Sequence, residues 1–285
     1  MMKHIVTLAD GRIVPALGQG TWYLGDSAAT HDREVEALRR GVDAGMTLID
    51  TAEMYGGGRS ERLVGDAIAG MRRDGLFLVS KVLPSNAGRR DIFHSCDETL
   101  RRLGTDYLDL YLLHWRGNVP LAETVECMER LVRDGKIRAW GVSNFDTDDM
   151  EELWRIPEGR HCLVNQVLYN PSSRGIEYDL LGWMNGHDVK LMAYCPIAQA
   201  GTLRRGLFDS PQLIEVAKRH HATVPQVILA WDIRNGNTIA IPRTGKSAHT
   251  LENAQADAIT LSDEDLALID QAWPAPNHKV PLDME

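Results

Sequence analysis

The chain has 285 residues, of which 44% are hydrophobic and 25% charged, as in an ordinary globular protein rather than a disordered or fibrous one. Its net charge of −9, with no basic stripe, argues against a nucleic-acid partner, because a phosphate backbone attracts positive charge. The sequence contains no apolar run near the ~20 residues of a membrane span and no apolar core of a secretion signal. We therefore expect a cytoplasmic protein that binds neither nucleic acid nor membrane.

The cysteines support the same compartment. Cys96, Cys127, Cys162 and Cys195 are far apart in the sequence and form no CxxC pair. This spacing argues against a zinc ribbon and against a dense disulfide framework, and it fits a reducing environment.

The first predicted element is a small β-hairpin over residues 5–18, "IVTLADGRIVPALG". Asp10-Gly11 lies between two β-prone runs, and this dipeptide supplies the positive φ angles that a tight hairpin turn requires.

After the hairpin, short apolar segments alternate with longer amphipathic ones. The predicted strands are 16–22, 47–52, 76–82, 107–115, 137–144, 163–170, 190–197 and 237–244. The predicted helices are 32–45, 60–71, 90–104, 121–135, 147–156, 176–187, 211–221, 224–234 and 247–256, followed by a last helix over 262–272 and an irregular C-terminal tail. Nearly continuous apolar strands are typical of a parallel sheet covered by helices.

Eight such units predict an α/β fold of the (β/α)8 TIM-barrel class, with the N-terminal hairpin and the short C-terminal tail added to it. The alternative is a doubly wound open sheet, which usually has fewer strands and a glycine-rich fingerprint after the first strand. The segment "LGQGTW" is not that fingerprint. Barrels of about 250 residues are routinely one domain, and no linker interrupts the chain, so we expect one domain over 1–285.

Polar side chains collect at the predicted strand ends, where barrels carry their sites. They are Asp50, Lys81, His114, Ser143, Asn144 and Gln166, with Tyr55 in the loop after Asp50. Taken singly, each has an ordinary explanation as a helix cap, an exposed lysine, a satisfied core histidine or a turn residue. Together they place several titratable groups on one rim, where unpaired charges without a function are costly.

Four of these residues suit proton donation to an oxygen that becomes negative during a reaction. A tyrosine with a pKa of about 10 is a weak acid, and we expect the Lys81 ammonium to lower the pKa of Tyr55. Asp50 can hold Lys81 by a charge-assisted hydrogen bond. His114 can orient a carbonyl oxygen toward the Tyr55 hydroxyl.

The sequence resembles the aldo-keto reductase superfamily over essentially the whole chain. The segments that carry the resemblance are "DTAEMYGGGRSE", "SKV", "YLDLYLLHW", "GVSNF", "NQVLYN" and "IPRTGKSAHTLEN". The resemblance implies a catalytic tetrad of Asp50, Tyr55, Lys81 and His114, with NADPH extended across the rim. The implied activity is reduction of an aldehyde or ketone to an alcohol.

The resemblance also implies the cofactor contacts. Ser143, Asn144 and Gln166 match residues that hydrogen-bond the nicotinamide carboxamide, and Tyr194 matches the aromatic that stacks on the ring. The remaining implied cofactor contacts are Thr21, Trp22, Asp50, Pro196, Leu203, Arg243, Thr244, His249, Glu252 and Asn253. Cys195 stands where the family often has serine, and we assign it no redox role.

The adenosine segment departs from the family pattern. Arg243 replaces a common lysine, Thr244 a serine, and His249 the arginine of members that prefer NADPH. Histidine is mostly neutral near pH 7, whereas arginine offers a charged fork to a phosphate. Because Arg243 keeps one charge there, we expect NADPH, with NADH as an alternative.

The substrate pocket is expected to contain Trp22, Tyr55, His114 and Trp115, and short loops imply an open pocket with broad tolerance for small carbonyl compounds. We expect a monomer or a weak oligomer. Two other functions are open: a non-catalytic NADP(H) sensor or auxiliary subunit, and a metal-dependent hydrolase using Asp50 and His114. The hydrolase lacks HxH or HExxH spacing, and Lys81 would repel its cation.

Overall fold

Eight parallel strands form the centre of the protein in a computed structural model that describes residues 2–198 and 206–285. They are β3 (Gln19–Gly20), β4 (Leu48–Asp50), β5 (Phe77–Val82), β6 (Leu110–Leu113), β7 (Trp140–Ser143), β8 (Val164–Leu168), β9 (Lys190–Tyr194) and β10 (Thr238–Ala240). Each strand pairs with the next in chain order. Parallel bridges from Leu17 to Ala240 and from Gly20 to Arg243 join the first strand to the last, so the sheet closes into the predicted barrel.

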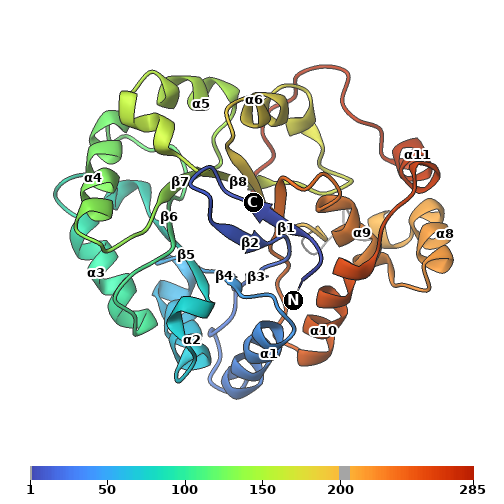
Figure 1. Ribbon diagram of the computed structural model, residues 1–285, viewed down its shortest axis with the longest axis horizontal. Helices are drawn as coiled ribbons and strands as arrows, with labels where there is room; N and C mark the ends of the chain where they lie inside the picture. The colour runs from blue at the N-terminus through green and yellow to red at the C-terminus, as the bar shows by residue number, and fades with distance from the viewer. Residues whose placement is uncertain (1, 199–205) are drawn as a thin grey trace.

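The helices surround this sheet (Figure 1). They are α1 (His31–Asp43), α2 (Arg59–Ile68), α3 (Ile92–Leu103), α4 (Leu121–Arg133), α5 (Thr147–Trp154), α6 (Leu180–Gly186), α8 (Pro211–Arg219), α9 (Val224–Asp232), α10 (Ser247–Gln255) and α11 (Asp263–Ala272). Local chemistry sets several ends: capping boxes at Asp146, Thr223 and Ser262 begin α5, α9 and α11. Gly104, with a φ of 66°, ends α3.

Alternation along each strand separates two hydrophobic cores. Leu110 and Leu112 point into the barrel, whereas Tyr111 and Leu113 pack against the surrounding helices. Successive strand side chains point to opposite faces, so every second residue faces the barrel axis. The same count places the side chains at positions 50, 81 and 114 inside the barrel, above its apolar layers.

The predicted hairpin is confirmed and covers one end of the barrel. Its strands are β1 (Ile5–Thr7) and β2 (Ile13–Pro15), and Val6 and Val14 join the inner core. Figure 1 shows the hairpin lying across the centre of the ring of helices. The prediction for its turn was wrong in one respect, because it expected positive φ angles at both Asp10 and Gly11. The loop spans residues 8–12, and of these two residues only Gly11 has a positive φ. A five-residue loop does not need two left-handed residues.

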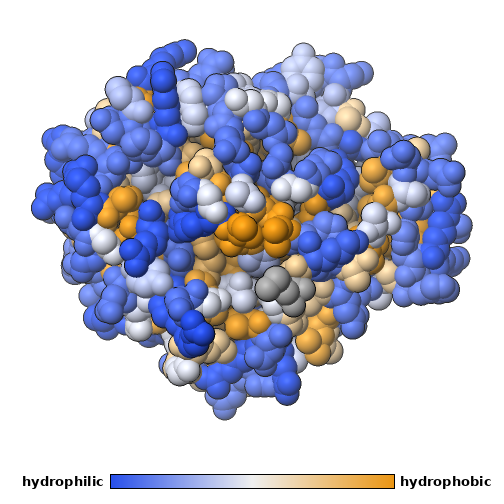
Figure 2. Space-filling view, viewed as in Figure 1, coloured by the Kyte–Doolittle hydropathy of each residue, from blue (hydrophilic) through white to orange (hydrophobic). Residues whose placement is uncertain are grey.

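The hairpin end of the barrel exposes little apolar surface. Figure 2 shows a mainly hydrophilic face with a small apolar patch near its centre, and the exposed large hydrophobic residues of the hairpin are Ile5 and Ile13. None of the helices in the described ranges 2–198 and 206–285 is long and apolar enough to cross a membrane.

Candidate active site

The strand ends opposite the hairpin bring the predicted residues to one place. Asp50 is the last residue of β4, Lys81 lies one residue before the end of β5, and His114 directly follows β6. The three side chains are buried, and Lys81 has no exposed surface. Because all three occupy inward positions of neighbouring strands, the barrel fold itself assembles the cluster.

Tyr55 reaches the same cluster from a turn rather than from a strand. The segment η1 (Tyr55–Gly57) is a single 3₁₀ turn, and Gly56, Gly57 and Gly58 all have positive φ values, between 56° and 84°. Only glycine adopts such conformations without steric cost. The glycine run therefore lets the chain reverse sharply and enter α2 while the Tyr55 ring turns inward.

Lys81 joins the cluster through its ammonium group. The Nζ atom donates hydrogen bonds to Asp50 Oδ2 at 2.7 Å, to the Thr51 carbonyl oxygen at 2.9 Å and to Tyr55 Oη at 3.1 Å. Gln166 Nε2 donates to the other Asp50 oxygen at 2.8 Å. An ammonium has three N–H donors, so all of them are used, and both Asp50 oxygens accept.

Burial and ion pairing shift the pKa values of Asp50 and Lys81 in opposite directions. Burial raises the pKa of Asp50 and lowers that of Lys81, because each charged form loses its water. The attraction between the two groups, and their hydrogen bond, opposes this effect at both residues. Each charge therefore depends on the other.

The prediction for the acidity of Tyr55 was wrong. Burial, followed by the negative charge of Asp50, raises the pKa of Tyr55 well above its ordinary value. Lys81 does not reverse this because its charge is balanced by Asp50 at 2.7 Å. In the free protein Tyr55 thus holds its proton firmly, as a hydrogen-bond acceptor from Lys81 and a proton donor toward the cavity.

His114 is a neutral imidazole in this environment. Burial, together with the nearby Lys81 charge, lowers the pKa of His114 to about 2. Its ring lies edge-on to Tyr55, with centroids 5.8 Å apart. Its Nδ1 is buried and has no hydrogen-bond partner in the described part of the chain. A neutral imidazole can donate one N–H to a carbonyl oxygen without competing for the proton of Tyr55.

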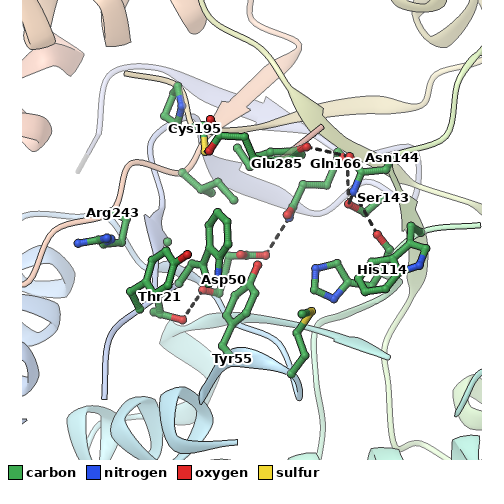
Figure 3. A pocket seen from close by; sticks show the side chains of 18 of the residues that line it. Thr21, Asp50, Tyr55, His114, Ser143, Asn144, Gln166, Cys195, Arg243 and Glu285 are labelled. Atoms are coloured by element: carbon green, nitrogen blue, oxygen red, sulfur yellow. Dashed lines mark hydrogen bonds between the residues drawn. The ribbon is translucent and has the colours of Figure 1, made fainter. Parts of the chain in front are cut away.

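These groups line a cavity of about 660 Å³. Its wall includes Trp22, Asp50, Tyr55, His114, Trp115, Ser143, Asn144, Gln166, Tyr194, Pro196, Arg243 and Glu285. Figure 3 shows Tyr55 and His114 pointing into the same space, with Arg243 at its margin. Across residues 2–198 and 206–285, no three His, Cys, Asp or Glu side chains are placed to hold a metal ion.

The sequence profile of the Aldo/keto reductase family matches residues 16–274. The chain belongs to this family. It is 50% identical over 284 residues to methylglyoxal reductase YeaE of Escherichia coli (strain K12), and the match covers 100% of both chains. It is 35% identical to glyoxal reductase of Bacillus subtilis (strain 168), and that match covers 94% of this chain and 92% of the relative.

A solved aldo/keto reductase from Klebsiella pneumoniae, in complex with NADP and acetate, has the same fold. Its TM-score is 0.97 at 54% identity, and the match covers 99% of this chain and 100% of that one. The family resemblance and the barrel fold predicted from the sequence are thus confirmed.

The side chains that the family pattern assigns to the nicotinamide lie together on one wall of the cavity. Ser143 Oγ donates to the Gln166 carbonyl oxygen at 2.8 Å, and Tyr194 Oη donates to Asn144 Oδ1 at 2.9 Å. The sequence had placed Gln166 at the end of its strand, but it lies inside β8. Its side chain still faces the inside of the barrel. Thr21 is fully buried, donates to the Asp50 carbonyl oxygen at 2.9 Å and lines the cavity.

The adenosine-side predictions lie further out. Of this group only Arg243 lines the cavity, whereas Thr244 precedes α10 and the exposed His249 and Glu252 lie on α10. Asn253 is buried at the end of that helix. Leu203 falls outside the described residues. The structure therefore brings the tetrad and the nicotinamide-side residues together and leaves the α10 residues on an adjoining surface.

Sequence reasoning missed several residues of the cavity wall, among them Tyr23, Met54 and Glu285. Tyr23, with a φ of 63°, stacks on Trp22 with ring centroids 4.7 Å apart. Met54 and Glu285 also line the cavity. The position of Tyr23 beside Trp22 was the available signal for the first. Glu285 carries no local signal, because an irregular segment shows no period that would place it.

Proposed function

We propose that this protein reduces the carbonyl group of small aldehydes and ketones to an alcohol, using NADPH. Tyr55 is the proton donor, Lys81 and Asp50 support it, and His114 orients the substrate oxygen. The observation that carries this proposal is the Lys81 ammonium, which hydrogen-bonds both Asp50 and the Tyr55 hydroxyl in a buried position.

The chain's own groups handle the proton. Tyr55 keeps its proton at neutral pH because burial and Asp50 raise its pKa. When the carbonyl oxygen gains negative charge, it becomes basic enough to take that proton, and the Lys81 hydrogen bond stabilises the phenolate that remains. The neutral His114 holds the oxygen in line with Tyr55.

The residues on the opposite wall fit a nicotinamide dinucleotide. The Gln166 Oε1 atom accepts no hydrogen bond from the described residues, and amide groups of this kind can bind a carboxamide. Tyr194 offers an aromatic face, and Arg243 a permanent positive charge toward a phosphate. When bound, NADPH supplies the hydride, and the protein supplies position and electrostatics.

The relatives named above indicate the substrate class. Methylglyoxal and glyoxal are small and uncharged and carry two adjacent carbonyl groups. Trp22 and Trp115 give the cavity apolar walls that can hold such compounds. We therefore infer that small dicarbonyl compounds are good substrates, within a broader tolerance for aldehydes.

Two observations bear on where and how the protein works. Cys96, Cys127 and Cys162 are free thiols, which fits a reducing cytoplasm, and the net charge of −9 disfavours nucleic acid. We propose a protein that acts there as a monomer or weak oligomer, folded as one domain over residues 1–285. The non-catalytic alternative is not favoured, because a buried ion pair aimed at Tyr55 has no purpose in simple nucleotide binding.

The deciding experiment has two arms. Tryptophan fluorescence titrated with NADPH and with NADH measures cofactor binding, and the loss of NADPH absorbance with methylglyoxal measures turnover. We expect tighter binding of NADPH than of NADH, and turnover that requires the carbonyl compound. Tight NADPH binding without turnover of any aldehyde or ketone would instead favour the sensor.

A further inference from the structure

The segment that follows α11 returns to the cavity. Residues 274–285 have no regular structure, and Figure 1 shows this segment leaving α11 and ending, at the label C, near the centre of the ring of helices. Lys279 forms an ion pair with Asp179 at 2.9 Å and another with Asp146. Asp283 accepts a hydrogen bond from Ser173 beside the rim. The segment is thus fastened up to residue 283.

Beyond the last of these contacts, the chain enters the proposed cofactor site. Met284 is exposed to solvent, and Glu285 lines the cavity with Tyr55 and His114. The Cys195 thiol donates to Glu285 Oε2 at 3.8 Å, and the Glu285 backbone lies near enough to the Tyr194 phenol to oppose the rise in its pKa that burial causes. Figure 3 shows Glu285 beside Cys195 on the wall opposite Tyr55.

The interactions of Glu285 are weak enough to be exchanged. A thiol is a poor hydrogen-bond donor, and burial, together with the Glu285 charge, raises the pKa of Cys195 to about 12, so it stays neutral. The Glu285 side chain remains exposed to water. When the Glu285 side chain leaves the cavity, it therefore leaves no buried charge without a partner.

Glu285 lies in the cavity that the proposed nicotinamide would enter, together with Tyr55 and Tyr194. Tyr194 is the residue proposed to stack on the nicotinamide, and Glu285 lines the same cavity as Tyr194. A dinucleotide also brings a negatively charged pyrophosphate, which a carboxylate repels. Because Asp283 fixes the chain two residues earlier, Glu285 is present at a high effective concentration whenever the site is empty.

We propose that Glu285 is an intramolecular competitor of the cofactor, occupying the nicotinamide end of the site until NADPH displaces it. This inference rests on the proposed function. A competitor of this kind lowers the fraction of binding-competent protein, and apparent affinity falls by that fraction. It also slows cofactor entry, because the site must open first.

The test compares NADPH binding in the unaltered protein and in Glu285→Ala, by tryptophan fluorescence at equilibrium and by stopped flow. We expect the variant to bind NADPH about two- to tenfold more tightly, with a faster association rate. Glu285→Gln, which keeps the size but not the charge, should show a smaller gain. Glu158→Gln, an exposed glutamate on η4 (Pro157–His161), is the matched control and should not change.

The possible failures can be told apart. If the unaltered protein binds no NADPH, the proposed function fails. If it binds NADPH and Glu285→Ala binds it with equal affinity, only the competition is overturned. Weaker binding by Glu285→Ala would also overturn it and would make Glu285 a direct contact of the cofactor.

Discussion

Asp50 and Asp232 are both almost fully buried, and their surroundings differ completely. Asp50, at the end of β4, accepts from Lys81 and Gln166 through its two oxygens. Asp232, at the end of α9, has no exposed surface, and neither of its oxygens has a partner in the described part of the chain. Burial raises the pKa of Asp232 well above its ordinary value, and Arg234 opposes this only in part.

The difference shows that burial alone does not make a site. Asp232 has no hydrogen-bond partner among the described residues, and it escapes the cost of a buried charge by keeping its proton. Asp50 keeps a charged partner, and that partner touches the phenol that lines the cavity. A buried charge therefore indicates a functional site when it has a counter-ion and contacts a group that lines a cavity.

The largest expected effect comes from removing the ammonium that links Asp50 to Tyr55. Lys81→Met leaves a similar volume but no charge, so the phenolate of Tyr55 loses its stabilising hydrogen bond. We expect turnover to fall by about 10²- to 10⁴-fold, measured as NADPH consumption with methylglyoxal.

Lys190→Met is the control for that experiment. Lys190 is also nearly buried and pairs with Asp188, but it lies at the start of β9, away from the cavity. Turnover in this variant should stay within about twofold of the unaltered protein. An equal loss in both variants would mean that Lys81 acts only through folding.

The same substitution at the two aspartates should have opposite effects on stability. Asp50→Leu leaves the Lys81 ammonium buried without its counter-ion, and we expect a loss of about 3–5 kcal/mol in the free energy of unfolding. Asp232→Leu removes a buried carboxyl group without partners, and we expect a gain on the order of 1–3 kcal/mol. Urea denaturation followed by circular dichroism measures both. Destabilisation by Asp232→Leu would show that its carboxyl group has an unseen partner.

The pH dependence of stability should single out Asp232. Its pKa is raised in the folded protein, so the folded state keeps a proton that the unfolded chain releases near pH 4. The unfolded state is therefore favoured progressively as pH rises above that value. The stability advantage of Asp232→Leu should be larger at pH 8 than at pH 5, and an advantage independent of pH would contradict the raised pKa.

The smallest expected effect concerns cofactor choice at α10. His249→Arg restores the charge that the family pattern has at this position and should improve NADPH affinity by about two- to tenfold, with little change for NADH. Fluorescence titration of both cofactors checks this. Equal improvement for both would mean that position 249 does not reach the 2′-phosphate.

The features that could be predicted from the sequence are the strands, their order in the barrel and the polar residues at their ends, because these depend on the hydrophobic period and on strand order. Inward positions at strand ends were sufficient to group Asp50, Lys81 and His114, because barrel geometry brings such positions together. The raised pKa of Tyr55 was not predictable, since it depends first on how deeply the phenol is buried in the folded chain and then on the nearby Asp50 charge. The return of Glu285 to the cavity and the lack of partners for Asp232 depend on long-range packing that leaves no periodic signal.

The most direct test of the proposed proton donor is Tyr55→Phe, which removes one hydroxyl and leaves the ring. NADPH affinity and the carbonyl-dependent rate of NADPH oxidation should be measured on the same preparation. We predict an unchanged dissociation constant for NADPH and a turnover number reduced by at least about 10²-fold. Turnover equal to that of the unaltered protein would contradict the role of Tyr55 as the proton donor.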